Sequence, residues 1–145
     1  MVLAVGRLGG NKFHYWDLAC LLDYVCTHTY PKFRNFCSKQ LSDLRTTYLT
    51  TFEHCLHGDL SGRNVLCEEF AGLSASRVSE EIEKEHIAMA LNSLLANGSL
   101  GALYWCYSDF NLPNELPYST SPFESHLGLV DVDGKPGAVA RELKG

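Results

Sequence analysis

The stretch Asn64-Val-Leu-Cys-Glu-Glu-Phe-Ala-Gly-Leu73 decides the fold, because it joins an apolar run to two adjacent carboxylates. The run from Val65 to Cys67 has turn residues on both sides and predicts a buried β-strand. Side chains alternate along a strand, so we expect Glu69 to share a face with Cys67 while Glu68 points to the other face. A carboxylate at the end of a buried strand costs free energy unless it is paired, exposed or used in chemistry. Glu69 is therefore the residue that the sequence singles out.

Length and composition predict one globular domain that spans residues 1–145. Hydrophobic residues make up 46% and charged residues 20% of the chain, which is typical of a folded protein. The formal net charge is −5 without any basic run, which argues against nucleic acid and anionic membrane surfaces as partners. No apolar run approaches the ~20 residues of a membrane-spanning helix. Met1–Gly6 lacks the basic flank of a signal peptide, so the sequence predicts no particular localisation.

The chain has six cysteines without any Cys-x-x-Cys pair, and a chain of this length needs no disulfide staples. We expect mostly free, buried thiols that behave as small hydrophobic side chains. Cys26, His28 and Cys67 could in principle bind zinc if they lie close together, but their spacing matches no zinc motif. The sequence therefore predicts no metal and no cofactor.

Strands are expected in three further places beside the Val65 strand. β-branched, aromatic or apolar runs mark residues 1–6, 24–30 and 100–107. Helical patterns lie between these strands and after the last one. This alternation predicts parallel βαβ units with functional residues at the carboxyl ends of the strands.

Helices are expected at residues 17–22, 38–56, 79–97 and 136–143, the third with Ser79 as its N-cap. Asn97-Gly98 ends that helix, as asparagine and glycine commonly do. The helix at 38–56 is expected to present one apolar face, which consists of Leu41, Leu44, Tyr48, Leu49 and Phe52.

Three of the predicted strands end in residues that can carry chemistry. The second ends in His28 and Tyr30, the third in Glu69 and the fourth in Trp105. If these side chains share one side of the sheet, the carboxylate lies between an imidazole and a phenol on one neighbour and an indole on the other. Trp105 is then a candidate platform for the apolar face of a sugar ring. Glu69 is a candidate nucleophile at an anomeric carbon, since a phenol that donates to a carboxylate favours its ionised form.

The same residues resemble the motifs of clan A glycoside hydrolases, the (β/α)8 retaining glycosidases that include the family 5 cellulases and mannanases. His28-Thr-Tyr30 resembles the motif that ends strand six, and Glu68-Glu69-Phe70 resembles the strand-seven motif whose glutamate is the nucleophile. Gly101-Ala-Leu-Tyr-Trp105 resembles strand eight, whose tryptophan lines the subsite at the cleaved bond. The tail from Pro122 to Pro136 is similar to the end of such barrels, and Met1–Gly6 would be strand five.

This resemblance implies an α/β fold that is half of a (β/α)8 TIM barrel, with four parallel strands and flanking helices. It implies retaining hydrolysis of β-1,4-linked glycans of the cellulose or mannan type. Glu69 would be the nucleophile with His28 and Tyr30 beside it, while Trp105 and Asp109 would bind substrate. Strand four of such enzymes carries the acid/base glutamate in an Asn-Glu pair. No Asn-Glu precedes His28, so the second catalytic carboxylate has no matching residue.

Half a barrel would leave two unpaired strand edges and one uncovered apolar face, both of which favour association. We therefore expect a homodimer in which strand five of each subunit pairs with strand eight of the other. The acid/base would then be missing, or borrowed from the loop after strand eight, where Asp109, Glu115 and Glu124 are candidates. Asp109 and Glu124 are otherwise expected to be solvated loop residues.

Simpler interpretations of these residues stay open. Glu69 can cap the following loop, His28 can be a hydrogen-bonded core histidine, and Trp105 can serve packing alone. The alternative function is an inactive or carbohydrate-binding fragment that self-associates and binds oligosaccharide through Trp105. A half-barrel enzyme with thiol chemistry at Cys67 is a third possibility, which depends on the expected inward position of that residue.

Overall fold

The computed structural model of the chain describes residues 19–31, 41–71, 78–116 and 118–144. Within these residues three strands form one parallel sheet in the order β1-β2-β3. The predicted α/β architecture with parallel strands is therefore confirmed for this part of the chain. The strand expected at residues 1–6 and the start of the helical turn expected from Asp17 lie outside the described residues. The strands are β1 (Tyr24–Thr29), β2 (Asn64–Phe70) and β3 (Ala102–Tyr104).

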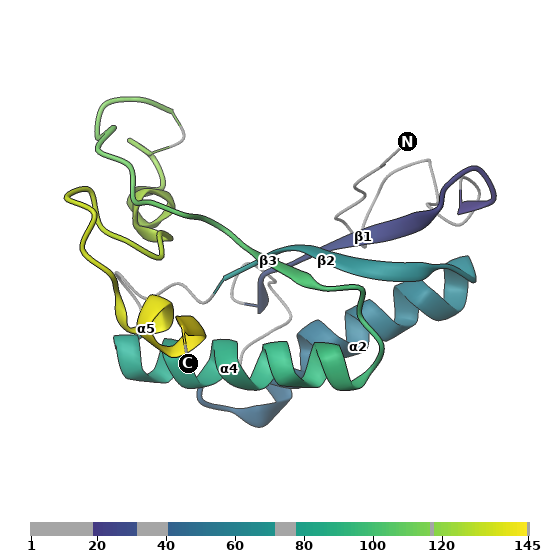
Figure 1. Cartoon of the computed structure of the whole chain (residues 1–145). Helices are drawn as coiled ribbons and strands as arrows, with labels where there is room; N and C mark the ends of the chain where they lie inside the picture. The colour runs from purple at the N-terminus through teal and green to yellow at the C-terminus, as the bar shows by residue number, and fades with distance from the viewer. Residues whose placement is uncertain (1–18, 32–40, 72–77, 117, 145) are drawn as a thin grey trace.

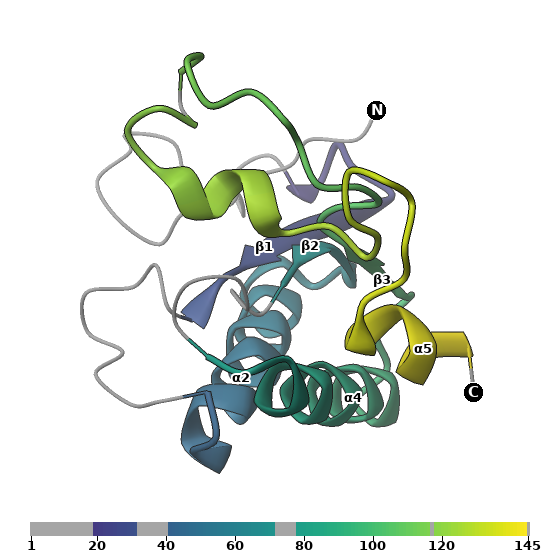
Figure 2. The ribbon, with the colours of Figure 1, turned by 90° about the vertical axis from the view of Figure 1, so that its left-hand side faces the viewer.

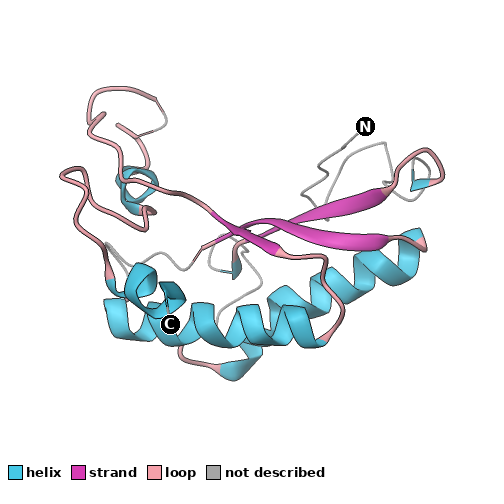
Figure 3. Ribbon diagram, in the orientation of Figure 1, coloured by secondary structure: helices cyan, strands magenta, loops and turns pink. Residues whose placement is uncertain are grey.

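The α-helices α2 (Leu44–Ser61), α4 (Glu80–Ala96) and α5 (Ala138–Lys144) lie on one side of this sheet, as Figure 1 and Figure 3 show. The short 3-10 helix η2 (Pro122–His126) lies on the opposite side, where Figure 2 shows it above β1 and β2. None of the described helices is long and apolar enough to span a bilayer. The sheet therefore has one face covered by helices and a second face, termed the open face below, that carries no α-helix of the described residues.

Helix α4 packs against the covered face, and it begins and ends at the residues that the sequence predicted. The Ser79 hydroxyl accepts a hydrogen bond from the backbone N–H of Ile82 at 3.4 Å, and Gly98 follows the helix with φ of 78°. The acidic residues of its first turn suit the positive end of the helix dipole. The core beneath the sheet contains Cys67, Phe70, Ile87, Leu94 and Val139.

Most of the predicted apolar face of the second helix is wrong, although Leu41, which precedes α2, is buried as expected. Leu44, Tyr48 and Phe52 of α2 are 50–60% exposed. The side that packs inward carries threonine and histidine, whose hydroxyl and ring groups pair with α4. These buried residues are Thr46, Thr47, Thr50, Thr51, Glu53, His54 and His57.

Hydrogen bonds explain why this polar face is tolerated. Thr47 Oγ1 lies 3.0 Å from His86 Nδ1, and the Thr51 hydroxyl donates to Ser93 Oγ at 2.8 Å. Burial lowers the pKa of His86 to about 4, so its ring is neutral at physiological pH. The prediction assumed that the largest apolar side chains face inward. The interface of α2 consists instead of threonine methyl groups and hydrogen-bonded polar groups, so the prediction missed it.

The strict side-chain alternation predicted for the third strand is also wrong. The β1–β2 register pairs Thr27 with Cys67 and His28 with Glu69, so Glu68 is an extra residue on β2, a β-bulge. Cys67 and Phe70 both lie in the core against α4, although they are three residues apart. A regular strand would place them on opposite faces. Glu69 therefore does not share the face of Cys67, as the bulge resets the alternation after Cys67.

The last strand is shorter than the predicted 100–107, since β3 spans only Ala102–Tyr104. The peptide bond between Trp105 and Cys106 is cis. The chain then forms a bridge between Ser108 and Val130. The expected turn at Asp131–Gly134 is present, with the Gly134 N–H donating to the Asp131 carbonyl at 3.0 Å. The cysteines that the structure describes form no disulfide, as predicted, although Cys20 is exposed; Cys37 lies outside the described residues.

Candidate active site at the carboxyl ends of the strands

The carboxyl ends of β1 and β2 bring both glutamates together with a histidine and a tyrosine. His28 Nε2 lies 3.0 Å from Glu68 Oε2, and His28 Nδ1 lies 3.3 Å from Glu69 Oε2. The Tyr30 hydroxyl donates to Glu69 Oε2 at 2.9 Å. The Cys26 thiol donates to Glu68. The predicted common face of Cys26, His28 and Tyr30 is thus confirmed by their shared contacts with the two carboxylates.

Glu68 belongs to this cluster, which corrects the prediction that it points away from Glu69. The bulge keeps both carboxylates on the open face, where His28 contacts each of them. The alternation rule could not find Glu68, because an extra residue in a strand leaves no mark in a period-two pattern. The only signal in the sequence was the pair of adjacent glutamates itself.

The tyrosine and the cysteine of the cluster stay protonated and act as donors. Burial, followed by the charge of Glu69, raises the pKa of Tyr30 far above its usual value. Burial, followed by the charge of Glu68, raises the pKa of the Cys26 thiol to about 12. Cys67, on the covered face, also has its pKa raised to about 12 by burial. Thiolate chemistry at Cys67 is therefore disfavoured by its surroundings.

One oxygen of Glu69 accepts a hydrogen bond from Tyr30, and the other has no donor among the described residues. Tyr30 and His28 both contact Oε2, while Oε1 takes no hydrogen bond from the described residues. The Glu69 side chain is 27% exposed, so a small molecule at the open face can reach it. A carboxylate with one oxygen held by a donor and the other exposed is oriented for attack on an electrophilic carbon.

Trp105 follows β3 at the edge of the same region. Tyr104 points to the covered face, where its ring packs edge-on against Phe70 at 5.8 Å and its hydroxyl donates to Glu83 at 3.3 Å. Continued alternation directs the next side chain, Trp105, to the open face. Trp105 is 41% exposed, so its ring is available for stacking.

Asp109 is engaged within the loop that follows β3. Its Oδ1 accepts a hydrogen bond from the Gly128 N–H at 2.7 Å, and its Oδ2 lies 3.6 Å from His126 Nδ1. The Asp109 N–H donates to the Val130 carbonyl at 2.9 Å. These contacts, termed the loop clasp below, tie residues 108–109 to residues 126–130. Asp109 thus holds the loop, rather than being the solvated residue of the simpler interpretation.

The other two acidic candidates differ in their surroundings. Glu115 is exposed, whereas Glu124 of η2 is half-buried and has its pKa raised by burial. The charge of Glu124 also raises the pKa of Tyr30, which places Glu124 within electrostatic reach of the cluster. Leu127, which follows η2, is buried beside Ala71, with Tyr30 packed against them. The loop of η2 therefore lies against the carboxylate cluster.

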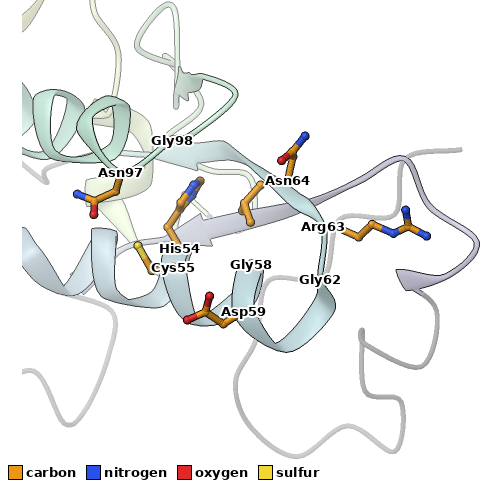
Figure 4. A pocket seen from close by; sticks show the side chains of 10 residues that line it. His54, Cys55, Gly58, Asp59, Gly62, Arg63, Asn64, Asn97 and Gly98 are labelled. Carbon is orange, nitrogen blue, oxygen red and sulfur yellow. The ribbon is translucent and has the colours of Figure 1, made fainter.

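A cavity of about 350 Å³ lies at the opposite end of β2, as Figure 4 shows. The ring of His54 lines it, and the Nδ1 atom of His54 is buried without a hydrogen-bond partner among the described residues. The cavity is far from the glutamates along the strand, and active sites of parallel α/β folds lie at the carboxyl ends of strands. We therefore place the candidate site at the carboxylate cluster. The cavity is lined by His54, Cys55, Gly58, Asp59, Gly62, Arg63, Asn64, Val65, Asn97 and Gly98.

The three residues considered for zinc do not converge. Cys67 packs against α4 on the covered face, whereas Cys26 and His28 contact Glu68 and Glu69 on the open face. Among the residues that the structure describes, no group of three or more histidine, cysteine, aspartate or glutamate side chains could hold a metal ion.

Comparison with solved structures identifies the kind of fold to which this site belongs. An exo-β-1,4-mannosidase from Opitutaceae bacterium strain TAV5 superposes with a TM-score of 0.74 at 27% sequence identity, covering 85% of this chain and 22% of that one. A GH5_18 protein from Bifidobacterium longum subsp. longum matches with a TM-score of 0.65 at 17% identity, covering 83% of this chain and 29% of that one. A GH5_18 variant from Streptomyces cattleya, solved with Manβ1-4GlcNAc, matches with a TM-score of 0.66 at 17% identity and covers 83% and 29%.

These matches confirm the predicted resemblance to family 5 glycoside hydrolases. The chain spans between a fifth and a third of the length of these solved proteins. No protein-family profile matches the chain. No curated protein matches it by sequence. The chain therefore resembles a fragment of a family 5 glycoside hydrolase, with a fold consistent with part of a TIM barrel.

Proposed function

We propose that the chain carries the nucleophile half of a retaining β-glycosidase site, with Glu69 as the nucleophile. The observation that supports this most is the arrangement at Glu69, whose Oε2 accepts from Tyr30 at 2.9 Å while Oε1 is unoccupied by the described residues. The Tyr30 hydroxyl fixes the orientation of the carboxylate by donating to one of its oxygens. The first step is then attack of Oε1 on the anomeric carbon, which forms a glycosyl ester and expels the aglycone.

The neighbouring residues have separate roles in this proposal. Tyr30 orients Glu69 by donating to Oε2, and His28 Nδ1 lies 3.3 Å from the same oxygen. Trp105 stacks against the sugar ring from the end of β3, where it is 41% exposed. Asp109 holds the loop beside the proposed substrate position through the loop clasp. A substrate hydroxyl that bonds to Asp109 would compete with Gly128 and His126 for the carboxylate oxygens.

Hydrolysis of natural substrates needs a second carboxyl group beside Glu69. An acid/base must protonate the leaving oxygen and later deprotonate the attacking water. We propose that this group is missing from the chain or comes from the strand-eight loop of a second copy. Glu124 is the best candidate of Asp109, Glu115 and Glu124, since burial raises its pKa in the direction that a general acid requires.

The proposed substrate is a β-linked mannoside, or more broadly a β-1,4-glycan of mannan or cellulose type. The similar Opitutaceae protein is an exo-β-1,4-mannosidase, and the similar Streptomyces cattleya structure contains Manβ1-4GlcNAc. These two proteins make the manno configuration the first to test here.

Covalent labelling tests the proposal without an acid/base. A 2-deoxy-2-fluoro-β-mannosyl fluoride has a leaving group that needs no proton, so Glu69 should form a stable ester with it. We expect intact mass spectrometry to show one added sugar, and peptide mapping to place it on Glu69. The gluco-configured reagent is the matched control for the choice of sugar. Labelling at another residue, or none with either reagent, would contradict the nucleophile assignment.

The rival function is a non-enzymatic fragment that binds oligosaccharide through Trp105. The exposed indole at the end of β3 is the observation that favours it. Binding of mannan or cellulose oligosaccharides without any covalent labelling by the fluorosugar would support this alternative.

We also propose that the half-barrel is completed by self-association of two copies. The open face of the sheet carries no α-helix of the described residues, and Leu103 of β3 is 54% exposed. Within the described residues, β3 pairs only with β2, which leaves its other edge for a strand of a second copy. A closed barrel buries both the edge and the face.

A charged residue at Leu103 tests this association. We expect the wild-type chain to have about twice its 16.1 kDa mass in light scattering at micromolar concentration, and Leu103→Lys to be monomeric. Leu95→Lys is the matched control, because Leu95 is 53% exposed but lies on α4, away from the open face. A wild-type monomer, or equal dissociation of both variants, would contradict barrel completion by two copies.

A further inference from the structure

The cavity at the amino end of β2 lies where two helices end. Gly58, Asp59 and Gly62 line it from the carboxyl end of α2, and Asn97 and Gly98 line it from the carboxyl end of α4 (Figure 4). Its volume of about 350 Å³ falls within the range of small-molecule sites, which is about 300–1,000 Å³. The cavity is therefore large enough for a small organic ligand.

The backbones of α2 and α4 give this cavity a negative potential. The carboxyl end of a helix carries the equivalent of about half a negative elementary charge. Lysine, arginine or histidine in the last turn commonly offsets that charge. Within these two described helices, neither last turn contains a basic residue. Two helix ends without such a cation therefore meet at one space, which favours a positively charged occupant.

The charged side chains of the lining add to this preference. Asp59 is an exposed carboxylate in the last turn of α2. Arg63 is the one cation among the lining residues, and its side chain is engaged elsewhere. Its Nε donates to the Ala19 carbonyl at 2.8 Å, and its guanidinium also donates to the Cys20 carbonyl at 3.3 Å. Figure 4 shows the guanidinium directed away from Asp59, so it leaves the negative potential of the cavity in place.

The buried ring of His54 adds an acceptor to the lining. His54 is 2% exposed, and its Nδ1 atom is buried without a hydrogen-bond partner among the described residues. In Figure 4 the ring lies between the side chains of Asn64 and Asn97, which line the same cavity. Burial lowers the pKa of His54, so the ring is neutral at physiological pH and one nitrogen carries a lone pair. A buried polar atom of this kind is unfavourable until a water or a ligand satisfies it.

We propose that this cavity, termed the helix-end site below, binds a small organic ammonium ion. An ammonium group has three N–H donors and no acceptor. It therefore complements helix-end carbonyls, a neutral imidazole and the oxygens of Asp59, Asn64 and Asn97. The net charge of −5 also attracts cations to the chain. A divalent metal is a poorer occupant, since no metal-binding group of three histidine, cysteine or acidic side chains exists among the described residues.

The probe 5-amino-1-pentanol tests the helix-end site, because it carries one ammonium group at pH 7. The neutral probe 1,5-pentanediol differs from it only in that group. We expect an NMR titration of the full chain with the amine to move the backbone amide signals of Gly58, Gly62 and Gly98. The diol should bind about tenfold more weakly. Asp59→Asn should weaken binding of the amine about threefold. Glu81→Gln, in the first turn of α4, is the matched control and should leave the affinity unchanged.

The titration separates the helix-end site from other sites that attract cations. Signals that move only at Glu68 and Glu69 would place the amine at the carboxylate cluster and overturn the proposal. No movement, or equal affinity for the amine and the diol, would also overturn it. The same glycine shifts with potassium chloride at equal concentration would assign the site to a monovalent metal ion instead. The wild-type titration needs no variant, so the test holds even if Asp59→Asn folds poorly.

Discussion

Glu69→Gln is expected to reduce hydrolysis of 2,4-dinitrophenyl β-mannoside by about 10³-fold or more. The amide has nearly the size of the carboxylate, and its oxygen can still accept from Tyr30, which donates to Glu69 Oε2 at 2.9 Å. It lacks the negative charge that attacks the anomeric carbon. The dinitrophenolate leaving group needs no general acid, so the assay reports the nucleophile even where the acid/base is absent. The measurement is the initial rate of dinitrophenolate release by absorbance.

Two controls make this result specific to the nucleophile. Glu81→Gln removes an exposed carboxylate from α4 and should leave the rate unchanged. In Glu69→Ala, added azide should restore release of dinitrophenolate and yield a mannosyl azide of inverted configuration, because azide enters the vacated space from the same side. Unchanged turnover in Glu69→Gln would exclude Glu69 as the nucleophile and leave any activity to another residue.

Gly128→Ala is expected to lower the free energy of unfolding by about 3 kcal/mol or more. A Cβ atom at Gly128 would lie 2.6 Å from the Val130 carbonyl oxygen and would overlap the backbone of Ser108 and Asp109. Backbone atoms cannot turn aside as a flexible side chain can, so the loop clasp must open. The 2.7 Å bond from the Gly128 N–H to Asp109 Oδ1 would be lost with it.

Thermal unfolding by circular dichroism measures this effect. A loss of about 3 kcal/mol should lower Tm by about 10 °C for a chain of this size. Gly137→Ala is the matched control, since its Cβ would meet only the Leu129 carbonyl oxygen at 3.5 Å, an ordinary contact. Equal Tm values for the two variants would show that the clasp does not restrain this loop.

The sequence was informative where local signals and packing agree. The strand at β2 and the helix α4 with its Ser79 cap were predicted because strand pattern, capping and turn residues point the same way. The neighbours of Glu69 followed from the order of the strands and from the motif that ends in Tyr30.

The failures have two physical causes. The inward face of α2 is built from threonines and histidines that bond to α4, so a search for large apolar residues chose Leu44, Tyr48 and Phe52, which are exposed. Glu68 was assigned to the wrong face because one extra residue in β2 changes the pairing with β1. The inward face of α2 depends on its partner helix α4, and the bulge in β2 depends on its pairing with β1. The residue pattern of a single helix or strand does not contain this information.

The bulge also bears on how this site could have changed during evolution. Cys67 and Phe70 stay in the core on either side of the extra residue, so β2 keeps its packing while it carries one more side chain. A chain without Glu68 would pass from Cys67 to Glu69 to Phe70 in ordinary alternation, with Glu69 still on the open face. A single-codon insertion or deletion at this position can therefore add or remove a charge beside Glu69 without disturbing the core. Inside a regular strand the same mutation moves every later side chain to the other face, whereas here the bulge takes up the extra residue.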